Sequence, residues 1–119
     1  MISKEKAEHY TWGKGCDGWH LLKSGEFSVI YERMPPGTSE IPHFHRNSRQ
    51  FFFVLSGEAT IEIAGKRETL STHQGAEVPS GVPHQIFNES KHDVEFLVIS
   101  QPPSHGDRVI FSSQASQDE

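Results

Sequence analysis

The sequence predicts an all-β protein built from short antiparallel strands. No stretch of a dozen residues carries apolar side chains at the 3.6-residue period of a helix, whereas short runs with a period of two recur along the chain. Proline and glycine interrupt these runs, as in Pro35-Pro36-Gly37 and Pro79-Ser80-Gly81. Many short strands joined by turns are typical of an antiparallel sandwich or barrel.

The expected strands follow from this alternation. They are Trp19–Lys23, Phe27–Met34, Ile41–His45, Gln50–Leu55, Glu58–Ile63, Lys66–Leu70, Glu77-Val78, Pro83–Phe87 and Val94–Ser100. Successive side chains of a strand point to opposite faces. The strongest run therefore places Gln50, Phe52 and Val54 on one face, which we expect to point inward.

Length and composition favour one domain, expected over residues 1–111. A chain of 119 residues is long enough for one self-sufficient core. The last stretch, residues 112–119, holds only Ser, Gln, Ala, Asp and Glu, and we expect it to be a flexible tail. The net charge of −5 argues against a nucleic-acid-binding face or a polybasic membrane anchor, since both need clustered positive charge.

Neither secretion nor membrane insertion is expected. The longest purely apolar run, Phe51–Leu55, is far too short to span a bilayer, and residues 1–15 carry no apolar core of a signal peptide. The single cysteine, Cys16, excludes an internal disulfide and fits a reducing compartment. We therefore expect a cytoplasmic protein, with Cys16 as an inert cysteine in a glycine-rich loop.

Histidine is the unusual residue of this composition, with eight copies. His43 and His45 stand two apart on an expected strand, so both imidazoles lie on one face and could bind the same metal ion. A pair of surface histidines on a strand is the commoner interpretation of such spacing. His9, His20, His92 and His105 have no partner at ligand spacing and are expected to be surface or loop residues.

Two longer spacings are more specific. Intervals of five, one, four and six residues separate Gly37, His43, His45, Gln50 and Gly57. Intervals of one, two and three residues separate Pro79, Gly81, His84 and Asn88. Together these spacings resemble the two signature motifs of the cupin superfamily, and the resemblance covers residues 37–57 and 73–88 directly.

The resemblance implies a small antiparallel β-barrel of jelly-roll type around one divalent metal ion. Its ligands would be His43, His45 and His84, with a fourth ligand position at Gln50, where the family has a carboxylate. A carboxamide is neutral and a weaker ligand than a carboxylate. The family's glycine six residues before Pro79 is His73 here, so the turn at this point is expected to differ or to use Gly75.

Three imidazoles without a carboxylate favour Zn, Ni, Cu or Fe over Mn, which prefers oxygen ligands. The resemblance implies a metal-dependent enzyme acting on a small organic molecule as a dioxygenase, an isomerase or a related Lewis-acid catalyst. Two alternatives stay open: a barrel that binds or senses a small molecule without turnover, and a metal-free cupin. Tyr31 and Glu77 are candidate general bases only because they lie near the motifs.

A homodimer is the expected assembly. An apolar row points away from Gln50 on two expected strands and consists of Phe51, Phe53, Leu55, Leu97 and Ile99. A barrel wall that is apolar on both faces must cover its outer face. The N-terminal strands could cover the row within one chain, or a second copy could do so across a two-fold interface, as cupins commonly do.

Overall fold

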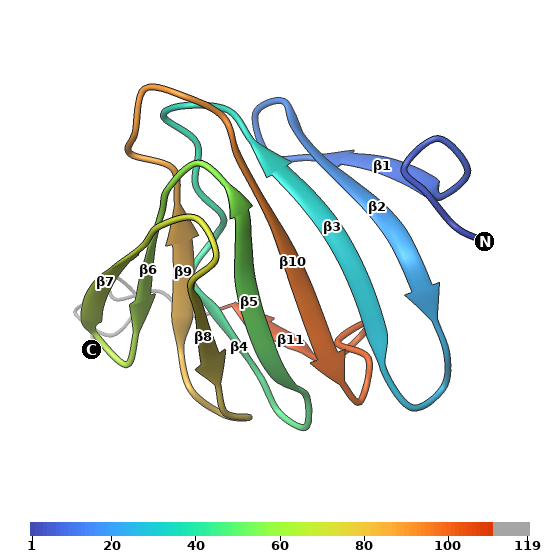
Figure 1. The fold of residues 1–119 in the computed structure, drawn as a ribbon. Coiled ribbons are helices and arrows are strands. Elements are labelled where there is room, and N and C mark those ends of the chain that lie inside the picture. The colour runs from blue at the N-terminus through green and yellow to red at the C-terminus, as the bar shows by residue number, and fades with distance from the viewer. Residues whose placement is uncertain (111–119) are drawn as a thin grey trace.

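The computed structural model describes residues 1–110, and within them the regular structure is entirely β (Figure 1). The strands are β1 (Glu8–Trp12), β2 (Cys16–Lys23), β3 (Ser28–Met34), β4 (His43–His45), β5 (Arg49–Ser56), β6 (Ala59–Ile63), β7 (Lys66–Leu70), β8 (Gly75–Val78), β9 (His84–Phe87), β10 (Val94–Gln101) and β11 (Arg108–Ile110). The predicted all-β class is confirmed. The predicted tail at 112–119 lies outside the described residues.

Two antiparallel sheets form the fold, rather than the closed barrel that we expected (Figure 1). One sheet has the strand order β1-β2-β3-β10-β5-β8, and the other has the order β11-β4-β9-β6-β7. Each strand pair within them is antiparallel. The chain crosses repeatedly between the sheets, so the architecture is a jelly-roll sandwich in which both sheets keep edges.

The core lies between the two sheets and follows the period of two. Phe52 and Val54 of β5 are buried, and so are Phe96 and Val98 of the neighbouring β10. They pack in one cluster with side chains of the second sheet such as Ile61. Gln50 is buried on the same face, which confirms the predicted inward orientation of this strand.

The outward row also lies where the alternation predicts it. Phe51 is 40% exposed, and Phe53, Leu55, Leu97 and Ile99 are half-buried. β1 and β2 continue the same sheet beyond β3 and end it at its edge. The N-terminal strands β1 and β2 therefore extend this sheet sideways and do not fold over the row.

Two turns contain residues with a positive backbone φ angle. Ala64 and Gly65 both have positive φ, 53° and 83°, which is the conformation of a two-residue turn between β6 and β7. His73 has a φ of 67°, a left-handed conformation that favours glycine. The position where the motif has glycine therefore has a backbone conformation that favours glycine, although the residue is histidine.

Two local expectations were wrong. β1 was not expected, and its residues alternate too weakly to be found by periodicity alone. Cys16 is not a loop residue, because it begins β2 and its side chain is buried in the core, where burial raises the pKa of the thiol. No helix in the described part of the chain is long and apolar enough to cross a membrane.

Candidate metal centre

Three buried histidines meet on the inner face of the second sheet. His43 and His45 lie on β4, and His84 begins β9 directly opposite His43 in the antiparallel register. Their ring centroids are 4.4 to 5.6 Å apart. One ligand nitrogen from each ring can be chosen so that all three lie within 4.8 Å of one another. This histidine triad could hold a metal ion.

Backbone carbonyls orient two of the rings. Nδ1 of His43 lies 2.7 Å from the carbonyl oxygen of Ile41, and Nδ1 of His84 lies 3.0 Å from that of Val82. A carbonyl can only accept a hydrogen bond, so Nδ1 carries the proton in each ring. The Nε2 atoms of His43 and His84 are therefore left with free lone pairs, which is the tautomer that a metal ligand needs.

The third ring lacks any partner of its own. Both ring nitrogens of His45 are buried, and neither has a hydrogen-bond partner among residues 1–110. Burying polar atoms without partners costs free energy, about 1–3 kcal/mol for each group. A cation bound to the triad would relieve this cost at one of the two nitrogens. The donor set therefore fits a divalent ion that accepts imidazole ligands.

Burial also keeps the triad uncharged. Desolvation lowers the pKa of His43 and of His45 to about 4, and it lowers the pKa of His84 as well. Imidazole must be neutral to ligate a metal. The three rings are thus in the ligating protonation state at neutral pH.

Gln50 lies beside the triad with its carboxamide held in place. Its Nε2 donates to the hydroxyl oxygen of Ser100 at 2.9 Å, so its Oε1 points the other way and lies 3.2 Å from Nε2 of His84. Both of these atoms present lone pairs, because the proton of His84 is on Nδ1. Two facing lone pairs are favourable only when a cation or a donor lies between them.

The C-terminal strand supports this part of the site. β11 pairs with β4, with Arg108 opposite His45 and Ile110 opposite His43. Just before β11, the carboxylate of Asp107 accepts hydrogen bonds from the backbone N–H groups of Arg46, Asn47 and Ser48, at 3.1, 2.9 and 2.8 Å. These bonds hold the pKa of Asp107 below its usual value and fix the turn that follows His45.

A cavity of about 270 Å³ opens in front of His43 and His45 of the triad, and two carboxyl groups share it. We call it the histidine cavity. Its lining includes His43, His45 and Gln50 together with Glu32 and Glu40, which we call the carboxyl pair. Sequence reasoning did not single out either glutamate, or three further lining residues, Tyr10, His105 and Arg108.

Burial makes the carboxyl pair unusually basic. Desolvation raises the pKa of Glu32 to about 7, against the opposing effect of a hydrogen bond from Tyr10. Desolvation and then the neighbouring charge of Glu32 raise the pKa of Glu40 to about 8. Both groups can therefore take up or release a proton near neutral pH.

Each carboxyl group is held by one hydrogen bond. Oε1 of Glu40 accepts from the backbone N–H of Ile86 at 3.2 Å. Oε2 of Glu32 accepts from the hydroxyl of Tyr10 at 3.1 Å, although Tyr10 lies two strands away on β1. The Tyr10 ring lies across Gly18 of β2 to reach Glu32. Any side chain at position 18 would clash with it, because a Cβ atom there would lie 2.2 Å from Cζ of the ring.

The bases suggested by their closeness to the motifs lie elsewhere. Tyr31 is on the opposite face of β3 from Glu32, where it packs edge-on against Trp19 and donates a hydrogen bond to Glu95. Glu77 is exposed on β8 and lies 3.7 Å from Arg49 in an ion pair. Neither residue therefore lines the histidine cavity: the inward face of β3 carries Ile30 and Glu32 instead of Tyr31, and Glu77 lies at the surface of β8.

Comparisons with known proteins identify one family. The cupin domain family matches residues 30–100. An oxalate-binding protein of Thermotoga maritima is 29% identical over 104 residues, which cover 82% of this chain and 86% of the relative.

Solved structures share the fold. A Thermotoga maritima structure described as a predicted oxalate decarboxylase has a TM-score of 0.77 at 24% identity, and the match covers 86% of this chain and 98% of the other. The polyketide cyclase RemF of Streptomyces resistomycificus has a TM-score of 0.80 at 19% identity, with 96% and 87% covered.

Proposed function

This chain belongs to the cupin family, and from that premise we propose that it is a divalent-metal enzyme that transfers protons to and from a small organic acid. The observation that carries the proposal is that the carboxyl pair lines the same cavity as His43 and His45, two members of the histidine triad. The triad supplies metal ligands, and Glu32 and Glu40 supply proton donors and acceptors with pKa values near neutrality.

The metal ligands in this proposal are His43, His45 and His84, with Oε1 of Gln50 as the fourth. The separation of 3.2 Å between Oε1 of Gln50 and Nε2 of His84 is compatible with two atoms that ligate one ion at about 2.0–2.2 Å each. Zn, Ni, Cu or Fe suits this set better than Mn. When bound, such an ion would act as a Lewis acid that polarises an oxygen of the substrate.

The protein's own groups do the rest of the work. Tyr10 occupies Oε2 of Glu32, which leaves Oε1 of Glu32 to take a proton from a carbon next to a carbonyl group. Glu40 is held by Ile86 and, with its higher pKa, is suited to return a proton. Arg108 lines the same cavity and favours an acidic substrate. The chemistry is that of an isomerase or related Lewis-acid catalyst.

The second candidate is binding of a small acid without turnover. It is favoured by the match to a relative named as an oxalate-binding protein and by Gln50, since the family's carboxylate ligand is missing. The two candidates share the metal and the acid. They differ in whether the carboxyl pair moves protons.

Hydrogen–deuterium exchange separates the two candidates. Pyruvate in deuterated buffer is incubated with the zinc-loaded protein, and loss of its methyl protons is followed by NMR. We expect exchange above the buffer rate, slowed at least tenfold by Glu32→Gln or Glu40→Gln and unchanged by the exposed control Glu77→Gln. Binding of pyruvate by calorimetry with no enhanced exchange would favour the non-catalytic candidate.

A further inference from the structure

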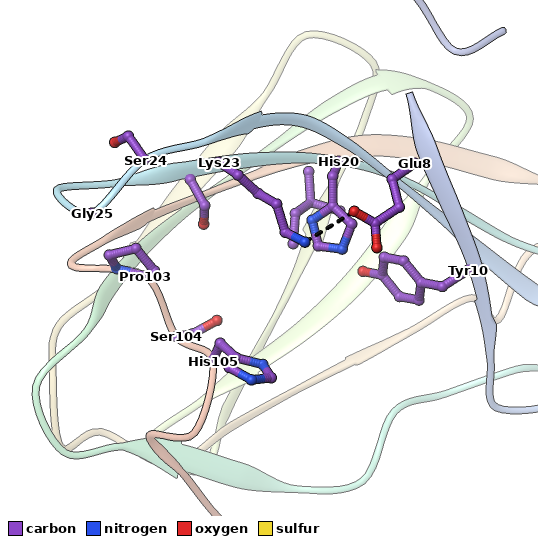
Figure 2. Close-up of a pocket in the computed structure, with 11 residues that line it drawn as sticks. Glu8, Tyr10, His20, Lys23, Ser24, Gly25, Pro103, Ser104 and His105 are labelled. Atoms are coloured by element: carbon purple, nitrogen blue, oxygen red, sulfur yellow. Dashed lines mark hydrogen bonds and ion pairs between the residues drawn. The ribbon is translucent and has the colours of Figure 1, made fainter. Parts of the chain in front are cut away.

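A second pocket adjoins the histidine cavity and is larger, with a volume of about 740 Å³ (Figure 2). It lies between the N-terminal strands β1–β3 and the segment that links β10 to β11. Its lining and that of the histidine cavity share four residues, Tyr10, Ile30, Ser104 and His105. The two spaces are therefore neighbouring chambers with a common wall, and we call the larger one the outer chamber.

Tyr10 links the two chambers. Its ring lines the outer chamber, and its hydroxyl donates to Glu32 in the histidine cavity. The ring holds this position by lying over Gly18 and beside His20, with ring centroids 5.0 Å apart. A molecule that reached from one chamber to the other would pass along the Tyr10 ring.

The walls of the outer chamber suit an apolar or aromatic group with few polar atoms. Ile30, Pro103 and the rings of Tyr10 and His20 supply flat and apolar surface. Figure 2 shows Tyr10 and His20 on one side and Ser104 and His105 on the other. At the rim, Lys23 lies 3.0 Å from Glu8, so these two charges compensate each other.

His20 has an unused hydrogen-bonding atom. Its Nδ1 is buried and has no hydrogen-bond partner in the described part of the chain. Burial lowers the pKa of this imidazole, so it is neutral at neutral pH and its ring contributes apolar surface as well. A polar atom without a partner beside a cavity is a place where a ligand can contribute a hydrogen bond.

We propose that the outer chamber binds the body of an elongated organic acid whose acid group lies in the histidine cavity. This inference rests on the proposed function, because it places the acid end at the triad and the carboxyl pair. An acid of two or three carbons would occupy only the inner cavity. A volume of 740 Å³ is within the range of sites for larger metabolites, about 300–1,000 Å³.

Two probes with the same head group test the proposal. Pyruvate and 4-phenyl-2-oxobutanoate are both 2-oxo acids, and only the second carries a body long enough to enter the outer chamber. Their affinities for the zinc-loaded protein are measured by calorimetry. We expect the phenyl acid to bind at least tenfold more tightly than pyruvate, because its ring is removed from water.

Variants locate the source of this preference. His20→Ala should weaken the phenyl acid at least fivefold and pyruvate less than twofold. Ser104→Trp should fill the outer chamber and remove the preference. The matched control is His92→Ala, because His92 is exposed and lines neither chamber. Circular dichroism checks that each variant is folded, and His20→Ala decides the matter if Ser104→Trp is not.

The outcomes distinguish this inference from the proposed function. If pyruvate binds but the phenyl acid binds no more tightly, or if the preference survives both variants, the outer chamber is not part of the ligand site and the proposed function stands. If neither acid binds to the zinc-loaded protein, both proposals are contradicted. A preference lost in His20→Ala and kept in His92→Ala supports the inference.

Discussion

The carboxyl pair shares its cavity with His43 and His45 of the histidine triad, but the two kinds of group respond to burial in opposite directions. Desolvation lowers the pKa of His43 and His45 to about 4 and raises those of Glu32 and Glu40 to about 7 and about 8. Both effects disfavour charge. Near neutral pH the cavity therefore holds neutral imidazoles, suited to ligate a cation, and carboxyl groups that are partly protonated, suited to exchange protons.

The two groups also differ in what holds them. Backbone carbonyls two residues away orient the rings of His43 and His84, although β4 and β9 must pair to bring these rings together. The carboxyl groups are held only by distant contacts, since Tyr10 of β1 holds Glu32 and Ile86 of β9 holds Glu40. The orientation of the two histidine rings is thus local in sequence, and that of the carboxyl pair depends on the assembled fold.

The largest expected effect is loss of the bound metal ion. Only substitutions in the triad should cause it. His43→Ala and His84→Ala should each lower zinc affinity at least 100-fold, because each removes one of three imidazole ligands. Glu32→Gln should keep metal stoichiometry, since the carboxyl pair does not ligate. Elemental analysis and competition with a chelator measure both, with His92→Ala as the control. Full metal content in a folded His84→Ala protein would place the metal elsewhere.

The second largest expected effect is on the pH dependence of stability, to which the carboxyl pair and the triad should contribute with opposite signs. The folded-state pKa values of Glu32 and Glu40 lie above the ordinary glutamate value of 4.5, so the folded protein binds more protons than the unfolded chain between about pH 4.5 and 8. These two groups therefore make the free energy of unfolding fall as pH rises through that window. The triad does the reverse, because its lowered pKa values make stability fall as pH drops from about 6.5 to 4.

Replacing both carboxyl groups tests this sign. In metal-free protein, the free energy of unfolding of wild type should fall by several kcal/mol more than that of the double variant Glu32→Gln, Glu40→Gln as the pH rises from 5 to 8.5. Urea denaturation at the two pH values measures the change, and Glu77→Gln should behave like wild type. Equal pH dependence in the double variant and wild type would mean that the pair is not titrating in this range.

The same contrast explains what could be predicted from the sequence. His43, His45, Gln50 and His84 follow from motif spacing and strand parity, because short-range periodicity fixes which face they occupy. The structure brings all four together around one point. Their role as a ligand set stays a prediction.

The carboxyl pair could not be found in this way. Glu32 has the inward parity of Ile30 and Met34, but its alternation is masked by Val29 and Tyr31, which are equally apolar and lie on the outer face. Glu40 lies outside any regular strand. The pairing of Tyr10 with Glu32 depends on a strand order that joins residues 22 positions apart. The strand pattern allowed a sandwich or a barrel, and the barrel implied by the family resemblance was wrong, because spacing within motifs does not specify whether the sheet edges join.

Substitutions of Gln50 should have smaller effects. Its carboxamide is neutral like the imidazoles of the triad, but it offers an oxygen atom like the carboxyl pair. Gln50→Glu adds a carboxylate to the triad and should increase Mn²⁺ affinity about tenfold, since Mn prefers oxygen ligands. Gln50→Ala should weaken zinc binding less than fivefold, because three imidazoles remain. Metal titrations measure both. Unchanged Mn²⁺ affinity in Gln50→Glu would assign Gln50 to orienting His84 instead of ligating.

Substitutions on the outer face of the larger sheet should have the smallest effect on the histidine cavity. The apolar row of Phe51, Phe53, Leu55, Leu97 and Ile99 has no covering strand in the described part of the chain, because β1 and β2 extend the sheet sideways. We predict that a second copy covers it in a two-fold homodimer, because an apolar sheet face left in water is costly.

Phe51→Glu tests this assembly without touching the cavity. Phe51 points away from Gln50 and is the most exposed member of the row, so a charge there should dissociate the dimer. Sedimentation should show a dimer for wild type and a monomer for Phe51→Glu, with Lys66→Glu, which is exposed on β7 of the other sheet, as the control. Zinc stoichiometry should not change, because the triad and the carboxyl pair both lie on inner surfaces of one chain. A wild-type protein that sediments as a monomer at all concentrations would contradict the dimer, and loss of zinc from Phe51→Glu would show that the site depends on the partner.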